Sequence, residues 1–363
     1  MSIKRTTFEH CGVKLEISSF ETNKGIGEYH IMFHVMHPTD NFEKQLNDIR
    51  LAFEYILSRY KNVKTVFKRY FLSDISNQLS FFDKEQASFV QQPPLDGSKI
   101  VLWVYLQSNC ENSGYKHLYT TGLYSPNSDS YTQTETILEK YADELKKEEC
   151  TIENDCIRTW FFINNIDINY GGVVNARKKF FEKHNLTENT HYIASTGIEG
   201  KYVNPETFVL FDSYAVKGLC ETQKQFLYAP THLSPTYKYG VTFERGIKID
   251  YGDRSHIFIS GTASIDNMGE IVAPGDICKQ AERMFENINA LLCEAKSNFD
   301  NIAQMIVYIR DIADYQIVNK ICKNRLVSIP HVIVLAPVCR PGWLIEAECI
   351  AVRNNDDCRF KPL

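Results

Sequence analysis

The stretch CKQAERMFENINALLCEAKSNFDNIAQMIVYIRDI, residues 278–312, decides the fold of this 363-residue chain. Its first half carries apolar residues at the spacing of one helix face: Ala281, Met284, Phe285, Ile288, Leu291 and Leu292. A continuous apolar run then extends from Ile302 to Ile309, and the turn Asp311-Ile312 follows. The pattern predicts an amphipathic helix, a short polar link and a buried strand.

The same pattern occurs twice more in the chain. Residues 41–75 place a helical apolar stripe before a strand at 66–72, and residues 134–166 place one before a strand at 156–163. The two stripes consist of Leu46, Ile49, Phe53, Ile56 and Tyr60, and of Ile137, Leu138, Tyr141 and Leu145. Both segments close on an Asp-Ile or Asn-Ile turn, so order, length and ending together predict a threefold internal repeat.

Extended segments flank each helix and strand pair. Those upstream are residues 29–37, 115–125 and 255–264, and those downstream are residues 98–108, 207–216 and 343–352. Each unit therefore reads roughly as ββαβαβ, an α+β layer with helices on one face of a sheet. Boundaries near Asp96–Ser98 and near Pro230 give three units, residues 1–97, 98–230 and 231–363.

Composition limits the class of protein. With 44% hydrophobic and 23% charged residues the chain is ordinary globular material, long enough for two or three compact units. A net charge of -5 argues against a nucleic-acid partner, and no apolar run is long enough to span a bilayer. The N-terminus lacks a secretory signal, and the eleven cysteines are an odd number without CxxC pairs. We expect a soluble cytoplasmic protein with reduced thiols, no metal and no cofactor.

A second informative stretch is CRPGWLIEAECIAV, residues 339–352. In a strand successive side chains alternate, so Glu346 and Glu348 share one face while the opposite face is wholly apolar. An unpaired buried carboxylate is costly. These two acids are therefore expected to face water, a basic partner or a cleft.

The third unit resembles the Rid/YjgF/endoribonuclease L-PSP family. The resemblance lies in SHIFISGTASIDNMGEIV (255–272), NIAQMIVYIRDIADYQIVN (301–319) and LIEAECIAV (344–352). It implies a chorismate-mutase-like α+β fold, in which small subunits form trimers with active sites in the clefts between them. One chain with three such units implies a pseudo-trimer with sheets inward and helices outward, present as a monomer or weak dimer.

This arrangement is similar to that of the chorismatases, which cleave chorismate. The resemblance is sharpest at residues 158–181, 194–200, 234–246 and 339–348, and covers most of residues 100–352. Rid deaminases have an arginine shortly before the final strand, but here VLAPVCRP (334–341) has Pro337 or Val338 in that place and Arg340 nearby. This departure disfavours an imine deaminase and fits a chorismatase.

Chorismate chemistry requires two cationic clamps and a proton donor, because chorismate is a dianion with an enolpyruvyl ether. Arginine suits the clamps because its planar fork binds carboxylates bidentately. We expect Arg158 and Arg245 in this role, although each could instead be a surface arginine lying over apolar residues. Arg177 is interpreted as a structural ion-pair partner.

Glu346 is the expected general acid, its pKa raised by a cleft of low dielectric constant. Glu348 would assist it or pair with a base, and the structural alternative for both is a salt bridge between units. Cys339 resembles the residue of the chorismatase subtype that makes 3-hydroxybenzoate rather than a dihydroxycyclohexadiene carboxylate. Its alternative role is packing as a small hydrophobic residue.

Backbone NH groups and hydroxyls would complete the pocket. The candidates are Gly261, Thr262, the segment 195–197 and the Tyr239 hydroxyl. The alternative for the glycine is a role in the turn alone, and the alternative for Tyr239 is a place in the core. The pocket is expected between the second and third units, with walls formed by Arg158, Tyr239, Arg245, Gly261, Cys339 and Glu346.

The resemblance therefore implies an enzyme that releases pyruvate from chorismate. The other product would be 3-hydroxybenzoate or a dihydroxycyclohexadiene carboxylate. The alternatives are a Rid-type enamine or imine deaminase and a non-enzymatic protein that binds small acids. A ribonuclease is disfavoured because it needs basic grooves with stacking aromatic residues.

Overall fold

The structure, a computed structural model, describes the chain except for residues 1, 23–25, 84, 110–113 and 127. Within the described residues each repeat forms its own sheet, two of six strands and one of four. The predicted α+β fold with three units in one chain is confirmed.

The first sheet has the order β1-β2-β3-β6-β4-β5. Its elements are β1 (Lys4–His10), β2 (Val13–Glu21), β3 (Gly27–Val35), α1 (Phe42–Arg59), β4 (Val63–Leu72), α2 (Ile75–Gln78), η1 (Leu79–Phe82), β5 (Ser88–Gln91) and β6 (Ile100–Ser108). Here α2 and η1 are single turns in the place where the other units carry a longer helix.

The second sheet has the order β7-β10-β8-β9. Its unit consists of β7 (Lys116–Tyr124), α3 (Ser130–Lys147), α4 (Ile152–Asp155), β8 (Cys156–Ile163), α5 (Ile166–Lys183), β9 (Ala194–Glu199) and β10 (Val209–Lys217). Among the residues described in this unit, one strand rather than the expected two precedes the first long helix. The sheet is therefore smaller than its neighbours.

The third sheet has the order β11-β12-β13-β16-β14-β15. Its elements are η2 (Glu221–Gln223), β11 (Lys224–Leu227), η3 (Thr236–Tyr239), β12 (Gly246–Asp250), β13 (Arg254–Ala263), α6 (Ile277–Glu294), η4 (Phe299–Asn301), β14 (Ile302–Ile309), η5 (Ile312–Asp314), α7 (Tyr315–Arg325), β15 (His331–Leu335) and β16 (Ile345–Asn354).

The three long helices that the repeat predicts begin in the same way. Asn41, Asp129 and Asp276 each accept a hydrogen bond at the N-terminus from the backbone NH three residues later. This is the usual N-cap geometry. Each helix has 18 residues and buries the stripe seen in the sequence.

The expected boundary at residues 97 and 98 does not follow the sheets. Strand β6 pairs with both β3 and β4, so it is a central strand of the first sheet. A unit boundary placed before β6 would remove this strand from the sheet to which it belongs. We therefore propose that the first unit extends through Ser108, and that the third begins near Cys220, before β11.

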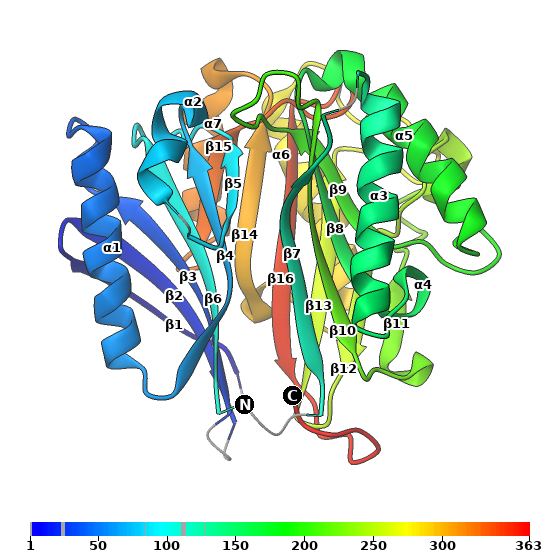
Figure 1. The fold of residues 1–363 in the computed structure, drawn as a ribbon, viewed down its shortest axis with the longest axis horizontal. Helices are drawn as coiled ribbons and strands as arrows, with labels where there is room; N and C mark the ends of the chain where they lie inside the picture. Colours follow the sequence, from blue (N-terminus) through cyan, green and yellow to red (C-terminus); the bar gives the residue numbers. More distant parts are fainter. Residues whose placement is uncertain (1, 23–25, 84, 110–113, 127) are drawn as a thin grey trace.

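The sheets face one another and the helices lie outside them. Figure 1 shows α1 on one flank, α3 and α5 on the other, and the strands between them. The largest buried cluster joins all three units and includes Phe67, Trp160 and Tyr308. The core thus lies where the units meet.

Buried ion pairs connect the units. Arg69 of the first unit bonds Asp212 of the second at 2.8 Å, and neither side chain is exposed. His256 of the third unit contacts Glu28 of the first at 2.8 Å. Because an uncompensated buried charge is costly, these pairs fix how the units meet.

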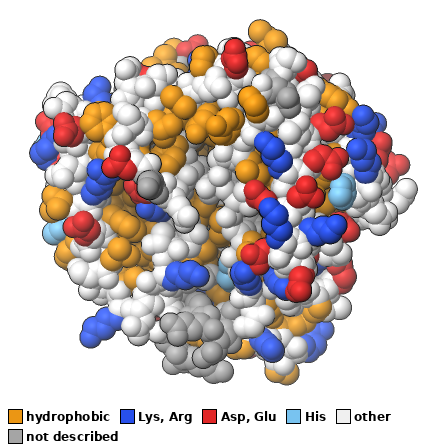
Figure 2. Space-filling view, viewed as in Figure 1, with side chains coloured by type: hydrophobic (Ala, Val, Ile, Leu, Met, Phe, Trp, Pro, Cys, Tyr) orange, Lys and Arg blue, Asp and Glu red, His pale blue; other side chains and the backbone are white. Residues whose placement is uncertain are grey.

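Charges of both signs are interspersed on the face drawn in Figure 2, most densely over α3 and α5. The described residues on this face form no continuous basic stripe. Among the described helices, none combines the length and the apolar character needed to cross a bilayer.

Candidate active site

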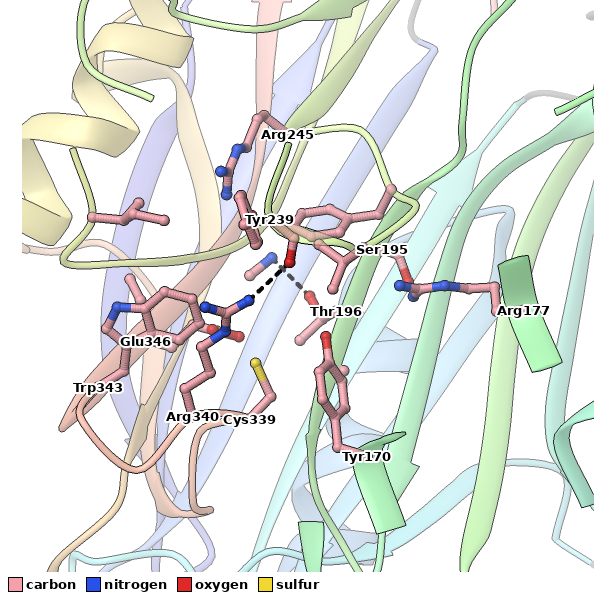
Figure 3. Close-up of a pocket in the computed structure, with 16 residues that line it drawn as sticks. Tyr170, Arg177, Ser195, Thr196, Tyr239, Arg245, Cys339, Arg340, Trp343 and Glu346 are labelled. Carbon is pink, nitrogen blue, oxygen red and sulfur yellow. Dashed lines mark hydrogen bonds between the residues drawn. The ribbon is translucent and has the colours of Figure 1, made fainter. Parts of the chain in front are cut away.

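A small cavity lies between the second and third units (Figure 3). Helix α5 and strand β9 form one wall, and β13, the segment before β12 and the segment leading into β16 form the other. It is lined by Tyr170, Arg177, Ser195, Thr196, Gly197, Tyr239, Val241, Phe243, Arg245, Gly261, Ala263, Ile265, Cys339, Arg340, Trp343 and Glu346. Its volume of about 30 Å³ is close to that of one water molecule.

Glu346 is the carboxyl group of this cavity. It lies near the start of β16, paired in register with Tyr308 on one side and Ala263 on the other. Burial, reinforced by the nearby charge of Glu348, raises the pKa of Glu346 to about 8. At neutral pH its carboxyl group is therefore mostly protonated and able to donate.

Glu348 faces a basic partner instead. Its carboxylate accepts bonds from Arg158 Nη2 at 2.7 Å and from Trp160 Nε1 at 2.7 Å, and from the hydroxyl of Thr196. The sequence left water, a basic partner or a cleft as surroundings for the two acids. Glu346 faces the cleft, and Glu348 faces the basic partner Arg158. The expected interface salt bridge exists for Glu348.

A glycine makes room for the acid. A Cβ atom at Gly261 would lie 2.2 Å from Oε1 of Glu346, well inside contact distance. The Gly261 NH also donates to Thr196 Oγ1 at 2.9 Å, which links the two walls of the cavity. Gly261 is therefore required by the close approach of the carboxyl group.

Three arginines line the cavity. Arg177 and Arg245 are buried, and each has a guanidinium NH without a hydrogen-bond partner among the described residues: Nη2 of Arg177 and Nε of Arg245. Arg340 donates to the Tyr239 carbonyl at 3.1 Å, and its guanidinium lies 5.0 Å from the Tyr239 ring centre. Buried unpaired donors are costly, and an anionic ligand would satisfy them.

The prediction that Arg158 walls this cavity is wrong. Its guanidinium is outside the lining and is taken up by Glu348 and Thr196. Thr262 is also outside the lining, because it is fully buried and its hydroxyl donates to the Ser260 carbonyl. The remaining expected wall residues, Tyr239, Arg245, Gly261, Cys339 and Glu346, do converge.

Cys339 lies in the segment that leads into β16 and its side chain points into the cavity (Figure 3). Burial, together with the charge of Glu346, raises the pKa of the Cys339 thiol to about 12. It is thus a neutral thiol near neutral pH rather than a thiolate nucleophile. Among the described residues, no three His, Cys, Asp or Glu side chains gather as ligands of a metal ion.

Only the third unit carries an acid at this position. Glu346 is paired with Tyr308, the second-last residue of β14. The second-last residues of β8 and β4 are paired with Leu210 and Val101, which are therefore the counterparts of Glu346 in the other two units. Both are apolar and buried. Among the three sheets, a carboxyl group at this register position is therefore found at one unit junction.

Sequence reasoning missed the arginine that enters from α5. Arg177 was interpreted as an ion-pair partner, yet it bonds Thr242 at 3.2 Å and extends toward the cavity (Figure 3). The one available signal was its place on the helix after the Gly171-Gly172 pair. Gly172 packs closely on Ser130, and its Cβ atom would lie 2.2 Å from Oγ.

Comparison with known proteins gives consistent relatives. The family model for Endoribonuclease L-PSP matches residues 245–353. A RutC family protein of Pyrococcus abyssi is 35% identical over 101 residues, 27% of this chain and 79% of that protein. The 2-iminobutanoate/2-iminopropanoate deaminase of Mus musculus is 29% identical over 100 residues, 27% of this chain and 74% of that enzyme.

One solved structure matches most of the chain. A crystal structure of a chorismatase superposes with a TM-score of 0.63 and covers 79% of this chain and 92% of its own. Sequence identity is 17%, so this likeness shows the fold.

Proposed function

The chain belongs to the RutC family, within the Rid/YjgF/endoribonuclease L-PSP superfamily, and from this premise we propose that it is a chorismatase-type enzyme. It would cleave the enolpyruvyl ether of chorismate and release pyruvate. The observation that carries the proposal is Glu346, a protonated carboxylic acid in a buried cavity lined by arginines.

The substrate's two carboxylates fit the unpaired donors. Arg177 enters the cavity from α5 and Arg245 from the third unit, so the two cations lie on opposite walls. Each has an NH free to bond a carboxylate. Charge-assisted bonds of this kind are roughly twice as strong as neutral ones.

Glu346 would donate its proton to the methylene carbon of the enol ether. The resulting oxocarbenium ion is attacked by water or by the ring hydroxyl, and the ether C–O bond breaks to give pyruvate. With water, the second product is a dihydroxycyclohexadiene carboxylate. Without net uptake of water, the ring hydroxyl oxygen bonds to the oxocarbenium carbon and leaves the ring as the keto oxygen of pyruvate, while the ring keeps the former ether oxygen. Loss of the ring C–H proton beside it, which returns a proton to Glu346, gives 3-hydroxybenzoate. We favour this product because Cys339 stands where the resembling subtype has cysteine.

Substrate entry requires the cavity to open. Small-molecule sites hold about 300–1,000 Å³, far more than the space present. The Tyr239 ring lies between two guanidinium groups, 5.3 Å from that of Arg245 and 5.0 Å from that of Arg340. We propose that the segment 234–244 moves outward with Tyr239. This movement would free the guanidinium groups of Arg245 and Arg340 for the substrate.

Incubation of the purified protein with chorismate tests the proposal. Chromatography should detect pyruvate together with an aromatic or dihydroxylated diene acid. Absence of pyruvate at protein concentrations equal to the substrate would refute it. Production of pyruvate from 2-iminopropanoate but not from chorismate would favour the deaminase.

A further inference from the structure

A second cleft corresponds to the active-site cavity but lies between the third and first units. It has a volume of about 510 Å³, within the usual range for small-molecule sites of about 300–1,000 Å³. One wall is α7 and β15, and the other is β2, β3 and the loop before β6. The same kinds of element, from the next pair of units, line the active-site cavity.

The correspondence holds residue by residue. Ser195 of β9 is paired with Thr159, four residues before the end of β8. His331 of β15 is paired with Met305, four residues before the end of β14, so His331 is the counterpart of Ser195. Counting from the same strand ends, Lys323 of α7 is the counterpart of Arg177 of α5. Val101 stands where Glu346 would be.

The lining of this second cleft combines apolar and charged side chains. Val332 and Ile333 on β15, with Ile329, form a buried apolar floor. Lys323 lines the cleft from α7 and is exposed. A ligand with an apolar body and one charged group matches such a surface.

His34 adds a partly buried cation. Its Nδ1 lies 3.4 Å from Asp96 Oδ2, and its Nε2 lies 3.6 Å from Glu16 Oε2, beyond hydrogen-bond distance. Burial opposes its charge, but these two carboxylates outweigh that effect and raise the pKa of His34 to about 9. Lys14 bonds Glu16 at 2.7 Å.

Charge balance then selects the sign of the ligand. Among the lining side chains, Lys14, His34 and Lys323 are cations, while Glu16 and Asp96 are carboxylates. Burial lowers the pKa of His331, which is therefore neutral at pH 7. One positive charge remains, on Lys323, for which no ion pair is found among the described residues.

We propose that this cleft is a second ligand site, which binds a small cyclic or aromatic monocarboxylate on Lys323 and does not transform it. Val101 takes the place of Glu346, so the carboxylic acid of the first cavity has no counterpart in this cleft. The proposal concerns binding only and does not depend on which reaction the first cavity performs.

Titration calorimetry with benzoate and with benzylamine tests it, because the two probes share a ring and differ in charge. Benzoate should bind the wild-type protein and Arg177→Gln, and its affinity should fall at least tenfold in Lys323→Gln. Lys320→Gln, an exposed neighbour on the same helix, is the matched control and should bind as wild type does. Equal affinity in Lys323→Gln and wild type, no benzoate binding, or tighter binding of benzylamine would each overturn the proposal.

Discussion

Replacing Glu346 with glutamine removes a titrating proton while keeping shape and volume. Removal of a positioned general acid typically lowers the rate by about 10²-fold to 10⁴-fold. The amide can still fit beside Gly261 and leaves the arginines of the cavity in place. Turnover of chorismate should therefore fall to that extent, with its binding largely retained.

The same substitution has a stability signature. Because the folded state raises the pKa of Glu346 from 4.5 to about 8, its contribution is fully present below about pH 4.5 and is lost as pH rises toward 8. Between about pH 5 and pH 8 this loss amounts to about 3 kcal/mol of unfolding free energy. Glutamine does not titrate and avoids the loss.

Urea unfolding at pH 5 and pH 8 measures this difference directly. The urea midpoint of Glu346→Gln minus that of wild type should be larger at pH 8 than at pH 5. A difference that stays constant with pH would refute the assignment of a protonated Glu346. Wild-type activity in the variant would refute its role as the acid.

Three further predictions concern the neighbours of the acid. Gly261→Ala should lower activity at least tenfold, because its Cβ would displace the carboxyl group, whereas Gly171→Ala, with no atom within 4 Å, should match wild type in the same assay. Glu348→Gln should shift the alkaline limit of the pH–rate profile below about pH 8, because the charge of Glu348 raises the pKa of the acid; it should also cost about 3–5 kcal/mol in urea unfolding by leaving Arg158 unpaired. An unshifted profile would contradict this account. Cys339→Ala should still release pyruvate but change the ratio of aromatic to diene acid, and an unchanged ratio would return Cys339 to a packing role.

Much of the fold was predictable because local patterns determine it. The apolar stripes and the runs at 156–163 and 302–309 became helices and strands with those bounds. The segment 98–108 was expected downstream of the first helix and strand pair, yet the expected boundary at residues 97 and 98 separated it from that unit. Strand β6 belongs to the first sheet through long-range pairing with β3 and β4, which sequence periodicity does not contain.

The candidate site shows the same division. Alternation along β16 placed Glu346 and Glu348 on one face, but it could not say that the two face different surroundings. Arg158 and Arg177 exchanged their expected roles because each depends on which element the neighbouring unit presents. Arg158 meets Glu348 of the third unit, whereas Arg177 meets Thr242 and the cavity.

The central claim is that a proton from Glu346 reaches the methylene carbon of chorismate. The most direct measurement is turnover in D₂O, with pyruvate trapped at once as lactate and examined by mass spectrometry. The account predicts one deuterium in the methyl group, since the carboxyl proton exchanges with solvent before transfer. Pyruvate formed without deuterium would show that the hydrogen comes from the substrate itself and would contradict the account.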